Sequence, residues 1–281
     1  MADDRWEGER VARWIASSRG LEGQLAPVAD ALFEVAVLQP DERVLDVGCG
    51  TGPTTHRAAA IVGPHGAVTG LDVSSAMLDA ARAATPLGAL ATIDWVAADA
   101  TTWPGGGSRF DAVISRFGVM FFDDPGRAFS NLAALTRPGG RLAIAVWAHR
   151  RLNPLFEVPL AAALAVRDGL HLPPADVPPP DAGPFSLAEP DAVTALLARA
   201  GWVDVSVDER PLQLPLAGGA PLDVAAKSTL EFGPTRVVTD DMDPSQRAAA
   251  VVAIAEALLP HVIDGAAVLD ARVLLVTARR Q

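Results

Sequence analysis

Short runs of β-branched and apolar residues alternate with helical segments between residues 43 and 147, and this alternation constrains the fold more than any other feature of the sequence. The runs are nearly continuously apolar, which is typical of strands in a parallel sheet that is buried on both faces. Repeated strand–helix units with short connections predict an α/β fold with a doubly wound, mostly parallel sheet. The expected strands cover residues 43–47, 67–73, 92–99, 110–117 and 141–147.

The chain is expected to divide into three parts, a helical cap, a sheet core and a C-terminal remainder, at residues 1–40, 41–150 and 151–281. The cap has apolar residues at helical spacing in two segments. It is therefore predicted to form two helices, over residues 5–18 and 21–38.

The C-terminal remainder is expected to complete the sheet. Strand patterns at residues 202–210 and 274–280 would bring it to seven strands, and residues 211–268 read as a helical insertion before the last strand. The proline-rich segment 172–184 cannot form a regular helix or a central strand. It is expected to serve as a stiff spacer or as the edge of a lid.

Composition excludes several classes of partner and site. The net charge of −11 argues against a nucleic-acid or anionic membrane partner, because few basic groups would neutralise phosphates. The first residues lack the basic and apolar regions of a signal peptide, and no run of about 18 apolar residues predicts a membrane span. The single cysteine, Cys49, excludes an intramolecular disulfide and a cysteine-built zinc site. A cytoplasmic protein that acts on a small molecule is expected, and a homodimer is left open.

Residues 44–52, VLDVGCGTG, run from an apolar strand into a glycine-rich turn and then into a helix. This is the topology of a nucleotide-cofactor site, where glycines let the backbone approach the ligand. A dinucleotide fingerprint needs its third glycine at position 53, where this chain has Pro53. Asp46, at the carboxyl end of the strand, would repel a pyrophosphate and attract an ammonium group. The pattern therefore favours a cofactor that carries a cation there.

S-adenosylmethionine carries an amino group, a sulfonium and an adenosine, and it fits this requirement. VLDVGCGTG resembles the first motif of the class I S-adenosylmethionine-dependent methyltransferases. SRFGVMFF (115–122) and RPGGRL (137–142) resemble the small-molecule enzymes of that family, near those of ubiquinone and menaquinone biosynthesis and of bacterial natural products. The resemblance covers about residues 40–147. It implies a Rossmann-like core, this cofactor with S-adenosylhomocysteine as product, and a small-molecule acceptor, with a role in secondary metabolism as one expectation.

Acidic residues end three consecutive expected strands, where open α/β sheets bind their ligands. Asp72 is placed to accept hydrogen bonds from ribose hydroxyls, as in nicotinamide enzymes. The resemblance implies that Asp46 recognises the amino group and that Asp99, with the N–H of Ala100, recognises adenine. Asp99 could instead form a cap or a turn, and Met77 could fill the core rather than contact adenine. The expected cofactor contacts are Asp46, Gly48, Cys49, Gly50, Gly52, Asp72, Val73, Met77, Asp99, Ala100 and Ser115.

The acceptor is expected next to the fourth strand. Arg116 would bind an anionic acceptor or pair with a nearby carboxylate, while Phe117 and Met120 belong to an apolar cluster that favours a hydrophobic acceptor. Methyl transfer from a sulfonium has a neutral leaving group, so alignment and exclusion of water are the main requirements. A hydroxyl or acidic carbon as acceptor would benefit from a base, and His149 is the best-placed candidate, although it also suits a solvated loop. No metal site is expected, because the acidic clusters lie elsewhere.

Other function classes compete with methyl transfer. A protein of this fold can bind the cofactor as a cyclase or a binding module without transferring the methyl group. A nicotinamide oxidoreductase would share the ribose-binding acid. A tRNA, rRNA or DNA acceptor is disfavoured by the net charge, and by SRFG at residues 115–118 in place of the (D/N/S)PP(Y/F) tetrapeptide of amino-directed nucleic-acid enzymes.

Overall fold

The computed structural model describes residues 6–85, 91–107 and 109–281, so the expectations for residues 1–5 lie outside the described residues. A mixed sheet forms the centre of the molecule, with strands in the order β3-β2-β1-β4-β5-β8-β6 and β7 paired to β8. The strands are β1 (Arg43–Val47), β2 (Ala67–Asp72), β3 (Thr92–Ala97), β4 (Phe110–Arg116), β5 (Thr136–Trp147), β6 (Trp202–Pro215), β7 (Val262–Ile263) and β8 (Ala266–Arg280).

The direction of the strands confirms the predicted doubly wound α/β fold. Strands β1 to β5 pair in parallel, whereas β8 runs antiparallel between β5 and β6. Each of the five runs predicted between residues 43 and 147 forms a strand. The carboxyl ends of β1 to β5 therefore meet at one edge of the sheet, the edge at which such sheets bind ligands.

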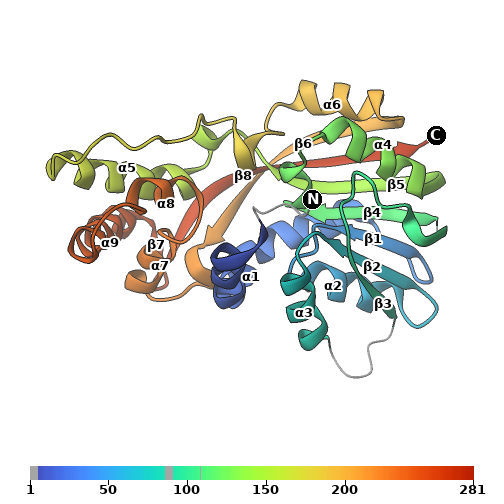
Figure 1. Cartoon of the computed structure of the whole chain (residues 1–281), viewed down its shortest axis with the longest axis horizontal. Coiled ribbons are helices and arrows are strands. Elements are labelled where there is room, and N and C mark those ends of the chain that lie inside the picture. Colours follow the sequence, from blue (N-terminus) through green and yellow to red (C-terminus); the bar gives the residue numbers. More distant parts are fainter. Residues whose placement is uncertain (1–5, 86–90, 108) are drawn as a thin grey trace.

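Helices cover both faces of the sheet (Figure 1). Helices α1, α2 and α3 pack on one face, and α4 and α6 pack on the other. The long strands β6 and β8 continue past the core and carry a second group of helices, α5, α7, α8 and α9, at the left of Figure 1. The helices are α1 (Gly8–Ala36), α2 (Pro53–Val62), α3 (Ser75–Ala84), α4 (Pro125–Leu135), α5 (Pro154–Gly169), α6 (Pro190–Arg199), α7 (Leu222–Ser228), α8 (Gly233–Thr239) and α9 (Pro244–Leu258).

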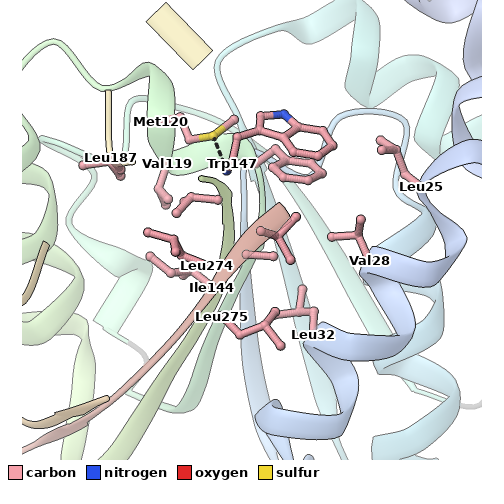
Figure 2. Packing of buried hydrophobic residues seen from close by; sticks show 14 of the residues in the cluster. Leu25, Val28, Leu32, Val119, Met120, Ile144, Trp147, Leu187, Leu274 and Leu275 are labelled. Carbon is pink, nitrogen blue, oxygen red and sulfur yellow. Dashed lines mark hydrogen bonds between the residues drawn. The ribbon is translucent and has the colours of Figure 1, made fainter. Parts of the chain in front are cut away.

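The apolar face of α1 shows why this helix docks on the sheet. Leu25, Val28 and Leu32 recur at spacings of three and four residues, which places them on one face of the helix. All three are buried, and Figure 2 shows them on the side of the sheet where Trp147 of β5 and Leu275 of β8 lie. Burial of such side chains contributes about 1.5–3 kcal/mol each. None of the described helices is both long enough and apolar enough to cross a membrane.

Two expectations about the elements are wrong in detail. Residues 5–18 and 21–38 were predicted as two helices, but one helix, α1, runs from Gly8 to Ala36. The helical insertion was placed at residues 211–268, but β6 continues to Pro215 and β8 begins at Ala266. β6 is an edge strand that pairs only with β8 among the described strands, and an edge strand tolerates proline because one side of its backbone needs no partner.

The proline-rich segment forms no α-helix and no strand, as predicted, and its last two residues begin the short 3-10 helix η5 (Gly183–Phe185). Side chains at both ends of the α5 region hold its backbone. Arg150 Nη1 donates to Pro178 O at 2.9 Å, and Arg167 Nε donates to Pro173 O. Arg167 is buried and also binds Asp241 through two nitrogens, at 2.7 and 2.9 Å. These bonds hold the backbone of the segment against both ends of the α5 region.

Candidate functional site

Asp46 is the most unusual polar residue at the ligand-facing edge. It lies near the end of β1 and is fully buried. Its Oδ2 accepts hydrogen bonds from the hydroxyls of Thr54 and Thr55, both at 2.6 Å, and both threonines lie in the first turn of α2. Its Oδ1 is the buried side-chain oxygen without a hydrogen-bond partner in the described part of the chain. Burial raises the pKa of Asp46 to about 6, against the lowering effect of the threonine hydroxyls and Arg116.

The glycine-rich turn folds tightly between β1 and α2. A β-carbon on Gly48 would lie 2.6 Å from Cα of Gly118, and Gly48 has a φ of +66°, so glycine is required there. A β-carbon on Gly52 would meet the Trp95 ring at 2.5 Å. At Gly50, by contrast, a β-carbon would meet no atom of the described residues within 4 Å. The turn is therefore packed on both sides and open at its centre.

Asp72 connects this turn to the next strand. Its Oδ2 accepts from the N–H of Gly50 and its Oδ1 from the N–H of Ser74, each at 2.9 Å. Burial raises the pKa of Asp72, and these backbone N–H groups oppose the rise. Each carboxylate oxygen can accept a second hydrogen bond, so Asp72 keeps acceptor capacity for a ligand. Val73, which follows it, is exposed.

Other predicted contacts form part of the scaffold. Asp99 is exposed and its Oδ1 accepts from Thr101 N at 2.7 Å, which is the turn geometry weighed as an alternative. The Ser115 hydroxyl donates to Val47 O at 2.7 Å and accepts from Gly118 N at 3.2 Å, and so connects β1 to β4. Met77 and Ala100 are buried. Cys49 is also buried. Desolvation is the main cause that raises the pKa of its thiol, and the nearby Asp46 and Asp72 raise it further, so the thiol stays protonated at neutral pH.

Arg116 pairs with a carboxylate, one of the two alternatives expected for it. Its Nη2 lies 2.5 Å from Glu22 Oε1, and the Arg116 side chain is only 8% exposed. Glu22 comes from α1, so this ion pair holds the helix to the end of β4. An anionic acceptor would have to compete with Glu22 for the guanidinium.

Phe117 and Met120 both contact Trp147, the last residue of β5. Phe117 stacks on Trp147, with ring centroids 4.2 Å apart and planes 13° from parallel. The Sδ atom of Met120 accepts from the N–H of Trp147 at 3.4 Å, as the dashed line in Figure 2 shows. Trp147 also meets Phe156 of α5 edge-on at 5.0 Å. An aromatic wall therefore runs from the end of β4 to α5.

His149 caps a short 3-10 helix, η4 (Arg150–Leu152). Its Nδ1 accepts from the N–H of Arg151 at 3.3 Å, and in a neutral ring the proton is then on Nε2. A role as a base stays a prediction. Among the described residues, no three His, Cys, Asp or Glu side chains are grouped closely enough to hold a metal ion.

Sequence reasoning missed Thr54, Thr55, Glu22, Trp147 and Phe156. The two threonines had a usable signal, because hydroxyl residues directly after the glycine turn lie within reach of the strand end. Glu22 had none, since it is 94 residues from Arg116 and the contact depends on how α1 docks.

A parallel sheet with a glycine-rich first crossover, a buried unsatisfied carboxylate oxygen beside it and a second acid on the next strand defines a Rossmann-like protein for a nucleoside cofactor. The comparisons identify the family. A family profile described as "methyltransferase domain" matches residues 44–140. Nocamycin O-methyltransferase from Saccharothrix syringae is 30% identical over 264 residues, which cover 90% of each chain.

Two other matches cover less of the chain or have lower sequence identity. Demethylmenaquinone methyltransferase from Renibacterium salmoninarum is 36% identical over 131 residues, 47% of this chain, and the match spans only half of that relative. A SAM-dependent methyltransferase structure from Aquifex aeolicus shares the fold, with a TM-score of 0.52 and 17% identity over 74% of this chain and 94% of that one. The chain belongs to the class I S-adenosylmethionine-dependent methyltransferases, and its cofactor is S-adenosylmethionine.

Proposed function

We propose that the chain transfers the methyl group of S-adenosylmethionine to a small-molecule acceptor and that Asp46 anchors the cofactor. The observation that carries this proposal is Asp46 Oδ1, a buried carboxylate oxygen with no partner among the described residues. A buried acceptor left unpaired is costly, so such an atom is expected to have a ligand partner. The amino group of the cofactor supplies a hydrogen-bond donor and a positive charge that pair with this oxygen.

The other residues of the crevice fit the remaining parts of the cofactor. The open side of Gly50 leaves room for the methionine and ribose portions. Asp72 holds the glycine turn through Gly50 N and retains acceptor capacity for the ribose hydroxyls. Asp99 stands on the exposed side of the same edge, where an adenine ring would lie.

The chemistry asks little of the chain beyond alignment. The bound cofactor supplies an electrophilic methyl carbon: the acceptor's lone pair bonds to it, the C–S electron pair stays on sulfur, and a hydroxyl acceptor loses its proton to solvent or a base. Phe117, Met120 and Trp147 are buried at the end of the sheet and exclude water from this edge. Arg116 and Glu22 fix α1 over it.

We propose oxygen as the accepting atom and secondary metabolism as the setting. The support is the likeness to nocamycin O-methyltransferase over 90% of both chains. The cyclase or binding-module alternative predicts binding of S-adenosylmethionine without transfer.

The test is release of S-adenosylhomocysteine when the purified chain is incubated with S-adenosylmethionine and a panel of phenols, quinols and neutral polycyclic alcohols. Release that depends on one acceptor supports methyl transfer, and Asp46→Asn should abolish most of it at low cofactor concentration. Binding of S-adenosylmethionine with no release from any acceptor would favour the binding-only alternative. Preference for NAD in a calorimetric titration would contradict the proposal.

A further inference from the structure

A cavity of about 240 Å³ lies where α1 meets the helices carried by β6 and β8. Residues of α1, α5, α7, α8 and the 3-10 turn η6 (Leu216–Gly218) line it. Its volume is slightly below the range of about 300–1,000 Å³ for drug-sized ligands, which suits a small ring system. Neither the cofactor residues nor Arg116 are among its lining residues.

None of the described side chains that line the cavity is charged. Three of its polar side chains each offer a defined hydrogen-bonding group. The hydroxyls of Ser228 and Thr229 each donate to a helix carbonyl at 2.7 Å, so they offer lone pairs rather than protons. Gln24 Oε1 accepts from Ala217 N at 3.0 Å, so its side-chain NH₂ is the group it can offer. A charged ligand would lose its hydration here without gaining an opposite charge.

Two phenyl rings on the cavity wall are held by other rings. Phe156 packs edge-on against Trp147 at 5.0 Å and against Phe185 at 5.2 Å. Phe232 packs edge-on against Trp14 of α1 at 5.1 Å. The next residue, Gly233, lies against Phe156, where a β-carbon would come within 3.5 Å of the ring. Rings fixed in this way lose little entropy when a ligand ring packs on them.

The same rings connect the cavity to the crevice. Phe156 contacts Trp147, and Trp147 stacks on Phe117, which directly follows β4. The wall of the cavity is thus two ring contacts from the strand end beside Asp46 and Arg116.

We propose that this cavity binds the methyl acceptor and selects an uncharged molecule built on aromatic or other unsaturated rings, with oxygen substituents that bond to Gln24, Ser228 and Thr229. Phe156 and Phe232 are the specificity-determining rings. The inference rests on the proposed function, because it places the acceptor of that methyl transfer. It disfavours anionic acceptors, since the described lining of the cavity offers no cation and Arg116 is paired with Glu22.

The test compares two probes of one shape, 2-naphthol and 2-naphthoate, titrated calorimetrically at pH 7 into the complex with S-adenosylhomocysteine. We expect saturable 1:1 binding of 2-naphthol that is at least tenfold tighter than binding of 2-naphthoate. Phe156→Leu and Phe232→Leu should each weaken 2-naphthol about five- to tenfold without changing affinity for S-adenosylhomocysteine. Phe122→Leu is the matched control, because Phe122 packs on Phe129, and it should bind 2-naphthol like the wild type.

The outcomes separate the two proposals. Equal binding of both probes, or 2-naphthol binding that neither phenylalanine variant changes, would overturn the cavity assignment and leave the proposed function intact. Failure of S-adenosylhomocysteine to bind at all would count against the proposed function, and the titration of 2-naphthol into the free chain would still report on the cavity. Thermal unfolding of each variant shows whether a lost signal reflects loss of the fold.

Discussion

The two oxygens of the Asp46 carboxylate have different surroundings. Thr54 and Thr55 donate to Oδ2, and nothing in the described chain donates to Oδ1. The threonines therefore orient the carboxylate so that its free oxygen points away from α2. Such an arrangement fixes the position of a ligand ammonium group as well as attracting it, since a charge-assisted hydrogen bond is directional.

Replacing the carboxylate with an amide tests this anchor. Asp46→Asn keeps the shape and an acceptor for the threonines but removes the charge. Loss of a hydrogen bond to a charged group costs about 1.5–3 kcal/mol, so affinity for S-adenosylhomocysteine should fall about 10- to 100-fold in calorimetry. Asp94→Asn, an exposed carboxylate on β3, is the control and should leave the affinity unchanged. Equal affinities of Asp46→Asn and the wild type would sink the assignment of the amino-group site.

The sequence predicted that Asp46 and Asp72 lie at strand ends, where the structure has them, but it did not predict which side chains they or Arg116 contact. Asp46 and Asp72 follow from their positions at strand ends, which local pattern defines. The pairing of Arg116 with Glu22, and the stacking of Phe117 on Trp147, depend on which elements become neighbours. A single sequence carries little direct information about contacts between residues so far apart.

Helix α1 is the element that joins the sheet to the second group of helices. Its Leu25 and Val28 pack on the core, while Gly20 and Gly23 lie against the backbone of η6. The sequence predicted two helices that meet at residues 19 and 20, and glycine costs about 1 kcal/mol in a helix interior. Tertiary contact overrides that preference here. The absence of side chains lets η6 approach the helix, and that approach closes the cavity.

The two glycines should respond to alanine with opposite signs. A β-carbon on Gly23 would lie 2.7 Å from Cα of Gly218, so η6 must shift, whereas one on Gly20 would have its nearest contact at 3.4 Å. Gly20→Ala should therefore raise the free energy of unfolding by about 0.5–1 kcal/mol through helix propensity. Gly23→Ala should lower it by up to about 2 kcal/mol, because overpacking exceeds that gain. Urea denaturation of both variants measures the difference, and equal stabilisation by both would contradict the close contact.

In the folded chain, strands β6 and β8 are longer than the sequence predicted. Residue pattern gave the seven strands of the main path, and β8 and β6 were recognised at the strand segments next to the core. β6 continues to Pro215 and β8 begins at Ala266, and these added parts of the two strands pair with each other outside the core sheet. The sequence did not predict this pairing, because Pro211 and Pro215 are unfavourable in a strand interior. The cavity lies between the core helix α1 and the helices on that extension, so no local pattern could have located it.

Burial of Asp46 also makes the stability of the whole molecule depend on pH. The pKa of Asp46 rises from 3.8 to about 6 on folding, so the folded chain binds its proton more tightly than the unfolded chain does. For this group, the free energy of unfolding then falls as pH rises from about 4 to 6, and the total cost is about 3 kcal/mol at neutral pH. Asp72, whose pKa burial also raises, acts in the same direction. Asp111, whose Arg137 partner lowers its pKa, acts in the opposite direction at lower pH.

Asp46→Asn isolates this contribution and ties it to the cofactor. Without ligand, the variant should be more stable than the wild type by about 1–3 kcal/mol at pH 7.5 and by about half of that at pH 5, measured by urea denaturation. The ammonium group of S-adenosylhomocysteine favours the ionised carboxylate, so wild-type affinity should increase about tenfold between pH 5 and pH 7. The variant's affinity should stay flat over that range. If affinity for S-adenosylhomocysteine changes with pH in the same way in both proteins, Asp46 does not ionise in the free chain as proposed. If the wild-type affinity rises with pH while the affinity of the variant stays flat, cofactor binding offsets the stability lost by burying this charge.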